Sequence, residues 1–139
     1  EWLGLLATSK PQTLAALWAE TGLAPDYVML RQAETGSVMV RGRAGSVGKA
    51  FNLGEMTVTR ASLRLADGTV GHGWCQGRDR TQAKTAALLD ALMQGPNAAR
   101  LETAVLTPLR KARAERRRSR AERAAATKVD FFTMARGDG

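Results

Sequence analysis

Residues Val58–Met93 read VTRASLRLADGTVGHGWCQGRDRTQAKTAALLDALM, and they carry the strongest structural signals in the chain. Asp67-Gly68 separates two segments of alternating apolar and polar residues, which predicts an antiparallel hairpin with a two-residue turn. The segment 76–79 (QGRD) ends the second strand. Asp79, followed three residues later by Gln82, predicts a capping box at the start of a helix.

A two-residue turn would set the pairing of side chains across this hairpin. In that register Leu63 faces His72 on an apolar side that meets the core, and Arg64 faces Gly71 on the opposite side. Arg60 and Arg64 would then stand over a strand that is nearly bare of side chains. We expect this side to be solvated, or to meet an anionic group or another backbone.

The segments around the hairpin predict the remaining elements. Helices are expected over residues 2–6, 11–22, 81–94 and 98–106, with an interruption at Pro108. Strands are expected over residues 26–33, 37–43, 51–65 and 70–76, with a turn at 34–36. This order predicts an α+β fold: an antiparallel four-stranded meander sheet, with two N-terminal helices and the C-terminal helices packed on it.

The composition limits the chemistry that the chain can perform. The 139 residues are enough for a real core, and no apolar run approaches the roughly 18 residues of a membrane helix. Cys75 is the single cysteine, so the chain forms no internal disulfide, holds no cysteine-rich metal site and fits a reducing cytoplasm. His72 is the single histidine, which leaves little for Ser-His or multi-histidine metal chemistry.

The net charge of +8 is concentrated in one segment. Residues 109–128 hold nine Lys or Arg and two Glu, whereas the other 119 residues hold twelve Lys or Arg and eleven acids. This segment favours a helix but has almost no large apolar residue, so we expect it to be solvated or to lie along another subunit or an acidic surface. We therefore divide the chain into a core domain (1–108), a basic helical arm (109–128) and a tail (129–139).

The tail, VDFFTMARGDG, has the composition of a buried segment. Two of the three phenylalanines of the chain are here. Exposed, such residues would be sticky, so we expect an extended C-terminal docking tail that binds a different chain. Its docking residues would be Val129, Phe131, Phe132, Met134 and Arg136.

The glycine-rich, basic segment 41–50 (RGRAGSVGKA) fails the test for a Walker A loop. Gly48-Lys49 is followed by Ala50 instead of Ser or Thr, and Arg43 occupies the position of the first glycine. We interpret the segment as an inter-strand loop in which Arg41, Arg43 and Lys49 would at most contact phosphate or a partner's carboxylates.

Five blocks together resemble the PhnG family. They are RQAETG (31–36), VTRASLRLADG (58–68), GHGWCQGRD (71–79), AALLDALMQ (86–94) and VDFFTMARGD (129–138). The resemblance covers nearly the whole chain, and the QGRD and VDFFTMxRGD blocks are its most specific parts. The segment 110–126 carries no diagnostic motif and is richer in arginine than the family pattern.

The resemblance implies an accessory subunit of the bacterial carbon–phosphorus lyase core complex, in phosphonate catabolism. Such a subunit assembles in the cytoplasm with PhnH, PhnI and PhnJ subunits, two copies of each. The complex exchanges the adenine of ATP for a phosphonate such as methylphosphonate. The resemblance also implies that this chain binds no cofactor, that the iron–sulfur cluster and S-adenosylmethionine belong to PhnJ, and that the catalytic groups lie on PhnI.

The candidate site residues are contacts, not catalysts. No catalytic or metal-binding residue is predicted, and candidate contacts to a partner or to phosphate are Arg60, Arg64, His72, Arg78 and Asp79. Each has a structural alternative: a solvated face for the arginines, a packed sheet histidine, and a turn with a helix cap at 78–79. The competing functions are a nucleic-acid-binding or structural interaction module that uses the arginine run, and a self-contained phosphate-binding enzyme. We expect neither nucleic acid nor a membrane as partner.

Overall fold

The computed structural model describes residues 2–44 and 49–137, and the side chains of residues 2–39 and 54–128. The chain divides into two compact units, Glu1–Leu109 and Arg110–Gly139. The first unit is an α+β domain, as predicted, and the second is helical.

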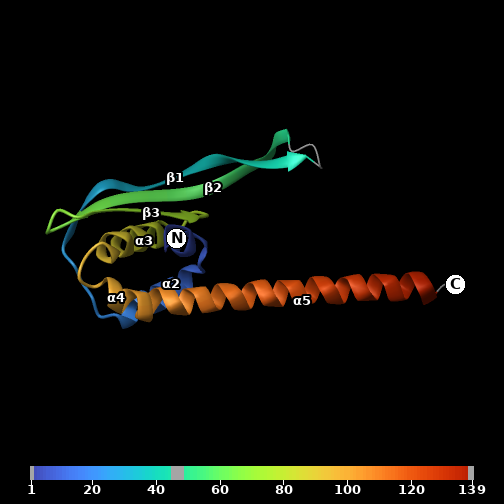
Figure 1. Cartoon of the computed structure of the whole chain (residues 1–139). Helices are drawn as coiled ribbons and strands as arrows, with labels where there is room; N and C mark the ends of the chain where they lie inside the picture. The colour runs from blue at the N-terminus through green and yellow to red at the C-terminus, as the bar shows by residue number, and fades with distance from the viewer. Residues whose placement is uncertain (1, 45–48, 138–139) are drawn as a thin grey trace. The chain divides into compact units, whose positions relative to one another are not determined.

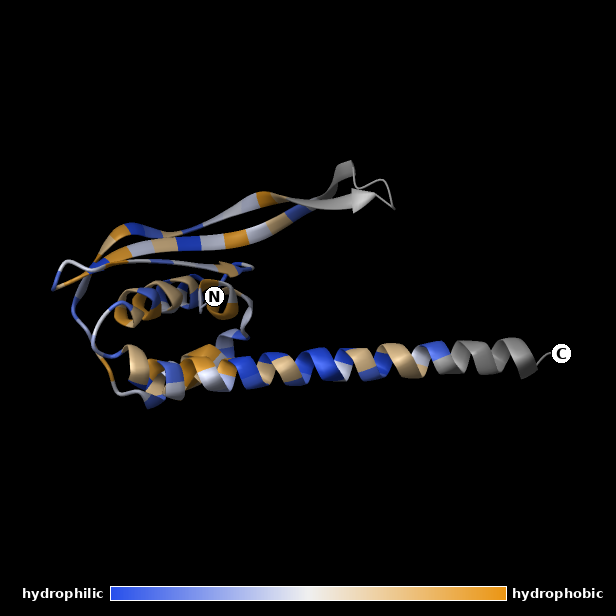
Figure 2. Cartoon of the chain, viewed as in Figure 1, coloured by the Kyte–Doolittle hydropathy of each residue, from blue (hydrophilic) through white to orange (hydrophobic). Residues whose placement is uncertain are grey.

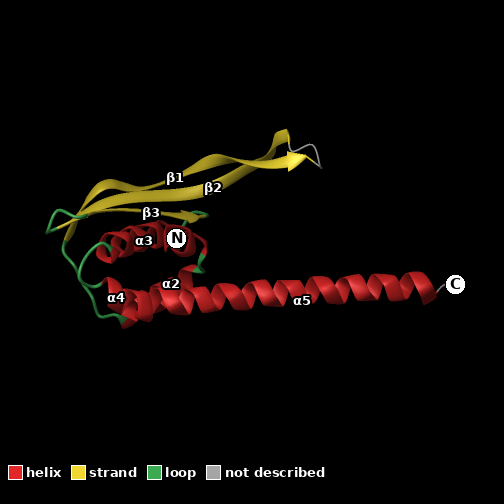
Figure 3. Ribbon diagram, in the orientation of Figure 1, coloured by secondary structure: helices red, strands yellow, loops and turns green. Residues whose placement is uncertain are grey.

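The first unit contains one antiparallel sheet and several helices (Figures 1 and 3). In chain order its elements are α1 (Trp2–Thr8), α2 (Pro11–Glu20), β1 (Tyr27–Ala44), β2 (Lys49–Leu65), β3 (Val70–Gln76), α3 (Arg80–Met93), α4 (Ala98–Leu101), a π-helical segment (Glu102–Leu106) and the start of α5 (Thr107–Gly137). The sheet order is β1-β2-β3, and α3 packs across one face of it. The π-helical segment ends immediately before the turn that contains Pro108, where the sequence predicts an interruption.

The described residues form three strands, so the prediction of a four-stranded meander is wrong. β1 runs without a turn through Glu34–Gly36, and Gly36 pairs with Val58 of β2. The register between the two strands shifts at three places, and two of these shifts, between Met29 and Arg31 and between Arg31 and Glu34, lie next to this segment. These bulges absorb extra residues while the strand continues, so a segment with turn-like composition stays in the sheet.

The hairpin between β2 and β3 also differs from the prediction. The Leu65 amide donates a hydrogen bond to the Thr69 carbonyl (2.8 Å), which makes the loop three residues long, 66–68. Gly68 has φ +94°, whereas no described non-glycine residue has a positive φ, so a type I′ turn with Asp67 is excluded. The Asp67 carboxylate accepts a hydrogen bond from the Thr69 amide (2.9 Å), and this bond lowers the pKa of Asp67.

The extra loop residue moves the register by one, which exchanges the two faces of β3. The predicted pairs across the hairpin are therefore wrong. The observed pairs are Leu63 with Gly71, Ala61 with Gly73, Ser62 with His72, and Arg60 with Trp74. The glycines thus share the core face with the apolar residues of β2, and the arginines share the opposite face with His72 and Trp74.

The core-side glycines let α3 lie directly on β3. A Cβ atom added to Gly71 would be 2.1 Å from the Ala87 carbonyl oxygen, and one added to Gly73 would be 2.3 Å from the Ala87 nitrogen. Ala83, Ala87 and Ala91 are spaced by four residues, which places them along one side of α3. Small residues on both elements therefore bring the two backbones into contact.

The start of α3 confirms half of the predicted capping box. The Asp79 carboxylate accepts a hydrogen bond from the backbone amide of Gln82 (2.9 Å). The Gln82 side chain does not return to Asp79. It is buried, and its Nε2 donates to the carbonyls of Leu6 (3.3 Å) and Ser9 (2.9 Å). Gln82 therefore ties α3 to the connection between α1 and α2.

The core of the first unit lies on the α3 side of the sheet. Its largest fully buried apolar side chains come from β2, from the helices that precede the strands in the chain and from those that follow them. They are Leu5, Leu6, Leu14, Leu63, Leu89, Leu101, Val105, Leu106 and Leu109. Trp2 and Trp18 pack against this cluster while partly exposed. The Arg100 guanidinium donates to the Thr21 carbonyl at the end of α2, which ties the C-terminal helices of the unit to its N-terminal ones.

The second unit is the continuation of α5 to Gly137. The prediction of an extended tail after residue 128 is wrong, because residues 129–137 are helical. The side chains proposed for docking, Val129, Phe131, Phe132, Met134 and Arg136, lie outside the described side chains, as do those of Arg41, Arg43 and Lys49.

We predict that Gly73→Ala destabilises the chain by about 3 kcal/mol, at the upper end for an overpacked core, because its Cβ would collide with the backbone of α3. Urea unfolding followed by circular dichroism measures the change. Gly36→Ala is the matched control, since a Cβ there meets nothing within 4 Å. Equal unfolding midpoints for the two variants would contradict the close packing of α3 on β3.

Candidate functional site

The face of the sheet opposite α3 is the candidate functional surface, which we call the outer sheet face. Its residues follow from the strand pairing: Val28, Leu30, Arg31 and Glu34 of β1, Arg60, Ser62 and Arg64 of β2, and Val70, His72 and Trp74 of β3. Arg31 pairs with Ser62, and Leu30, which is exposed, is the residue that the bulge inserts between Met29 and Arg31. In the first unit α3 lies on the opposite face (Figure 1), and α1 borders the outer sheet face through Leu3.

A shallow hollow of about 210 Å³ lies on the outer sheet face. It is lined by Leu3, Arg31, Arg60, Ala61, Ser62, His72, Gly73 and Trp74. The hollow brings together two predicted contact residues, Arg60 and His72. It also contains Arg31 and Trp74, which are not among the contact residues predicted from the sequence. A second hollow, of about 140 Å³, shares Arg31 and Arg60 and includes Glu34.

His72 is exposed in this hollow, so the prediction that it packs against Leu63 in the core is wrong. Its Nδ1 lies 2.9 Å from the Ser62 hydroxyl oxygen, and the two atoms share a hydrogen bond. This bond fixes one nitrogen of the imidazole ring. Nε2 therefore remains as the ring atom that is available to a ligand or a partner.

The buried carboxylate of Asp90 holds the strand that carries His72. Asp90 lies on α3 and is 7% exposed. Its Oδ2 accepts the His72 backbone amide (2.8 Å), and its Oδ1 accepts the indole nitrogen of Trp2 from α1 (2.7 Å). A single carboxylate thus joins α1, α3 and the edge strand β3, and it takes up an edge amide that would otherwise be unpaired.

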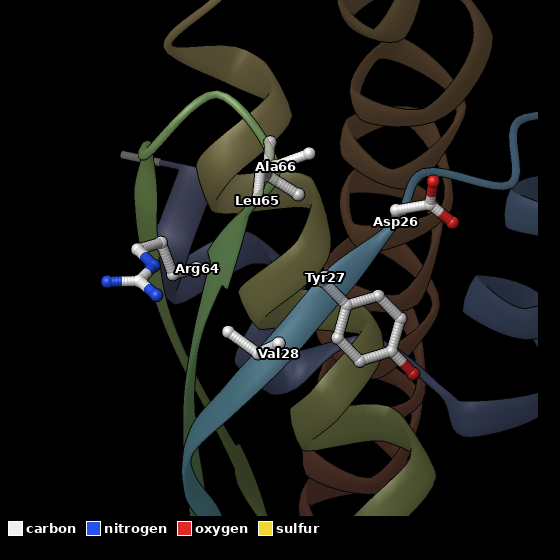
Figure 4. A pocket seen from close by; sticks show the side chains of 6 residues that line it. All are labelled: Asp26, Tyr27, Val28, Arg64, Leu65 and Ala66. Atoms are coloured by element: carbon white, nitrogen blue, oxygen red, sulfur yellow. The ribbon is translucent and has the colours of Figure 1, made fainter.

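Arg64 lies on the same face but away from the hollow. It lines a separate pocket of about 190 Å³ with Asp26, Tyr27, Val28, Leu65 and Ala66 (Figure 4). Arg60 and Arg64 are four residues apart on β2, which places their Cα atoms about 13 Å apart. The pockets that Arg60 and Arg64 line have no residue in common, so the structure does not bring the two side chains to one site.

The other predicted contacts, Arg78 and Asp79, lie between β3 and α3. Arg78 is exposed, whereas the Asp79 carboxylate is used as the cap of α3. The Cys75 thiol donates to the Asp79 carbonyl (3.3 Å) and is fully buried. Burial, reinforced by the charge of Asp79, raises the pKa of the Cys75 thiol, so the side chain is a neutral core residue and not a nucleophile.

The chemistry that these residues support is binding. Among the side chains that the structure describes, Arg31, Arg60 and Arg64 form no ion pair or side-chain hydrogen bond. The residues that the structure describes include no group of three or more His, Cys, Asp and Glu placed to hold a metal ion. The outer sheet face therefore offers three arginines without ion pairs among the described residues, together with aliphatic side chains and one indole.

The basic stretch of α5 is exposed along its described length. Every side chain from Arg117 to Lys128 is exposed, and Figure 2 shows this part of α5 as mostly hydrophilic, with tan bands of higher hydropathy between the blue ones. The neighbouring arginines at 116–118 repel one another. None of the helices in the part of the chain that the structure covers combines the length and hydropathy that a bilayer crossing requires.

The predicted two-residue turn places Val70 and Trp74 on the core face, whereas the observed three-residue loop places them on the outer sheet face. A signal for the correct register was present in the alanines at 83, 87 and 91. A helix side made of alanines needs a partner without side chains, and the glycines at 71 and 73 provide one. That pairing would have placed Trp74 and His72 on the opposite face.

We predict that Asp90→Ala lowers the free energy of unfolding by about 3 kcal/mol, because two donors, one on Trp2 and one on His72, lose a charged acceptor. Urea denaturation measures the loss. Asp26→Ala is the control, since Asp26 is exposed. Asp90→Asn, which keeps one acceptor oxygen, should lie between the two. An Asp90→Ala protein as stable as the control would show that the carboxylate is not needed to hold the strand.

The chain matches, over residues 1–137, a family described as phosphonate metabolism protein PhnG. It is 46% identical over 140 residues to the alpha-D-ribose 1-methylphosphonate 5-triphosphate synthase subunit PhnG of Rhizobium meliloti (strain 1021). That alignment covers 99% of this chain and 88% of the relative.

Proposed function

The chain belongs to the PhnG family of phosphonate metabolism proteins, and we propose that it is a subunit of an alpha-D-ribose 1-methylphosphonate 5-triphosphate synthase. The observation that carries this proposal is the 46% identity to a subunit of that synthase along 99% of the chain. The reaction breaks the bond between C1′ of the ATP ribose and adenine. It forms a bond between C1′ and a phosphonate oxygen, so the products are the ribose 1-phosphonate 5-triphosphate and adenine.

The side chains of the outer sheet face support a role in assembly or positioning for this chain. Glycosyl transfer needs a group that protonates or stabilises the leaving base and a group that assists the attacking oxygen. The outer sheet face has one carboxylate, Glu34, opposite Arg60, and a histidine whose Nδ1 is held by Ser62. The arrangement favours contact with other molecules, and the catalytic groups of the synthase would lie on another subunit.

The partners in this proposal are PhnH-, PhnI- and PhnJ-type subunits in a cytoplasmic hetero-octamer with two copies of each chain. ATP and the phosphonate are substrates of the assembly. The iron–sulfur cluster and S-adenosylmethionine serve the later cleavage of the carbon–phosphorus bond on the PhnJ-type subunit. The residues of this chain that would contact a partner or phosphate are Arg60, Arg64, His72 and Arg78, whereas Asp79 acts as a helix cap.

We predict that the chain alone releases no adenine from ATP and methylphosphonate, and that adenine appears when the PhnH-, PhnI- and PhnJ-type subunits are present. Chromatography of adenine and phosphorus NMR of the ribose 1-phosphonate product measure the reaction. The three partner subunits without this chain are the control and should be inactive. Equal rates with and without the chain, or adenine release by the chain alone, would overturn the proposed function.

We also propose that residues 129–139 dock on a partner subunit, because Val129, Phe131, Phe132 and Met134 together would need an apolar cover. The double variant Phe131→Ser/Phe132→Ser should lose most of the partner retained by a tagged chain in size-exclusion chromatography. Asp130→Ser/Thr133→Ser changes the same helix without the aromatic rings and should bind normally. Normal assembly of the variant without both rings would contradict docking by this segment. It would not contradict the proposed function.

A further inference from the structure

We propose that the outer sheet face docks a partner subunit through a surface on that subunit that is apolar at its centre and acidic around it. The inference rests on the proposed function, since it takes the chain to be part of an enzyme complex. It assigns the docking to Val28, Leu30, Arg31, Arg60 and Arg64. Four observations carry it: apolar exposure, charge, the spacing of the arginines and the state of the sheet edge.

The apolar content of the face is the first observation. An antiparallel sheet with one face in water places polar side chains on that face. Here Val28 and Leu30 of β1 are each 52% exposed, and Val70 and Trp74 are half-buried on β3. Large aliphatic and aromatic groups together with arginine are the residue types that protein interfaces concentrate. The face therefore has the composition of an interface that is uncovered in the isolated chain.

The charge of the face selects the partner. Arg31, Arg60 and Arg64 share the face with one carboxylate, Glu34, and Asp26 lines the pocket of Arg64, but among the described residues none of the three arginines is in an ion pair. A second copy of the chain on this face would place arginines against arginines, which disfavours self-association. Acidic side chains on a partner would instead pair with the arginines and steer the encounter.

The spacing of the arginines favours a protein over a small ligand. Arg60 and Arg64 are about 13 Å apart along β2, and the three strands add about 10 Å in the perpendicular direction. The two pockets that contain Arg60 and Arg64 have no lining residue in common. A small anion would occupy one of them, whereas a protein surface can cover both and the apolar groups between them.

The edge of β3 indicates that the partner lies on the face and does not add a strand there. Strand addition needs free backbone amides along an edge. The His72 amide is already bound by the Asp90 carboxylate, and α1 packs against β3. Side chains, not main-chain hydrogen bonds, would therefore give this contact its affinity.

The test uses the full-length chain, tagged and co-expressed with the PhnH-, PhnI- and PhnJ-type subunits. Arg60→Glu/Arg64→Glu should weaken binding of the partner by about 100-fold at physiological salt, because each reversal places like charges together. Lys10→Glu/Arg80→Glu is the matched control: it makes the same change in charge at two exposed positions outside the outer sheet face. It should assemble normally. Affinity is measured by biolayer interferometry, and folding by thermal melting.

A second variant tests the apolar side chains of the outer sheet face. It also tests the docking if the charge reversal changes the melting temperature of the chain. Val28→Ser/Leu30→Ser removes two exposed side chains, so it should leave the melting temperature nearly unchanged and weaken binding by about tenfold or more. The effect of the charge reversal should shrink at high salt, whereas the effect of the serine pair should not.

The outcomes separate this inference from the proposed function. Loss of binding in both outer-face variants with a normal control supports the docking. Normal binding by both variants overturns it, as does normal assembly with loss of adenine release, which would assign the face to substrate. A salt-sensitive dimer of the lone chain that the charge reversal abolishes would also overturn it. If the unchanged chain binds none of the three subunits, the proposed function fails and the docking fails with it.

Discussion

The close approach of α3 to β3 is the constraint on which the rest of the structure depends. Two glycines on β3 meet three alanines on α3, and a single added Cβ would lie about 2 Å from the helix backbone. Because one face of β3 is thus occupied by a helix, the large side chains of Val70, His72 and Trp74 point the other way, and only the small Cys75 joins the glycines on the core face. Contact between the two backbones therefore determines which residues the sheet presents to other molecules.

The polar contacts of α3 reinforce the same arrangement. Gln82 near its start binds the connection between α1 and α2, and Asp90 near its end binds Trp2 and the β3 backbone. Both side chains are buried, and among the described residues no buried side-chain nitrogen or oxygen lacks a hydrogen bond. α3 is therefore fixed at both ends, so the outer sheet face has a rigid support, as a docking surface requires.

The division of labour proposed for the chain follows from this support. One side of the sheet stabilises the fold, because leucines and alanines pack there around α3. The other side carries arginines without ion pairs among the described residues, an indole and exposed aliphatic groups. A subunit that is not itself a catalyst needs such an arrangement, because its contribution to a shared enzyme is made through contact with other chains.

The sequence by itself determined the α+β class, α1 to α3, the cap at Asp79 and the family. These depend on local periodicity, capping and motifs, which short segments carry without help from the rest of the fold. The strand count, the three-residue turn and the choice of outward face were decided by tertiary structure. Bulges keep β1 continuous through a segment with turn-like composition. A one-residue shift in the β2–β3 register exchanges the core face and the outer face of β3. The packing of α3 against glycine decides between them, since only one register leaves room for a helix backbone.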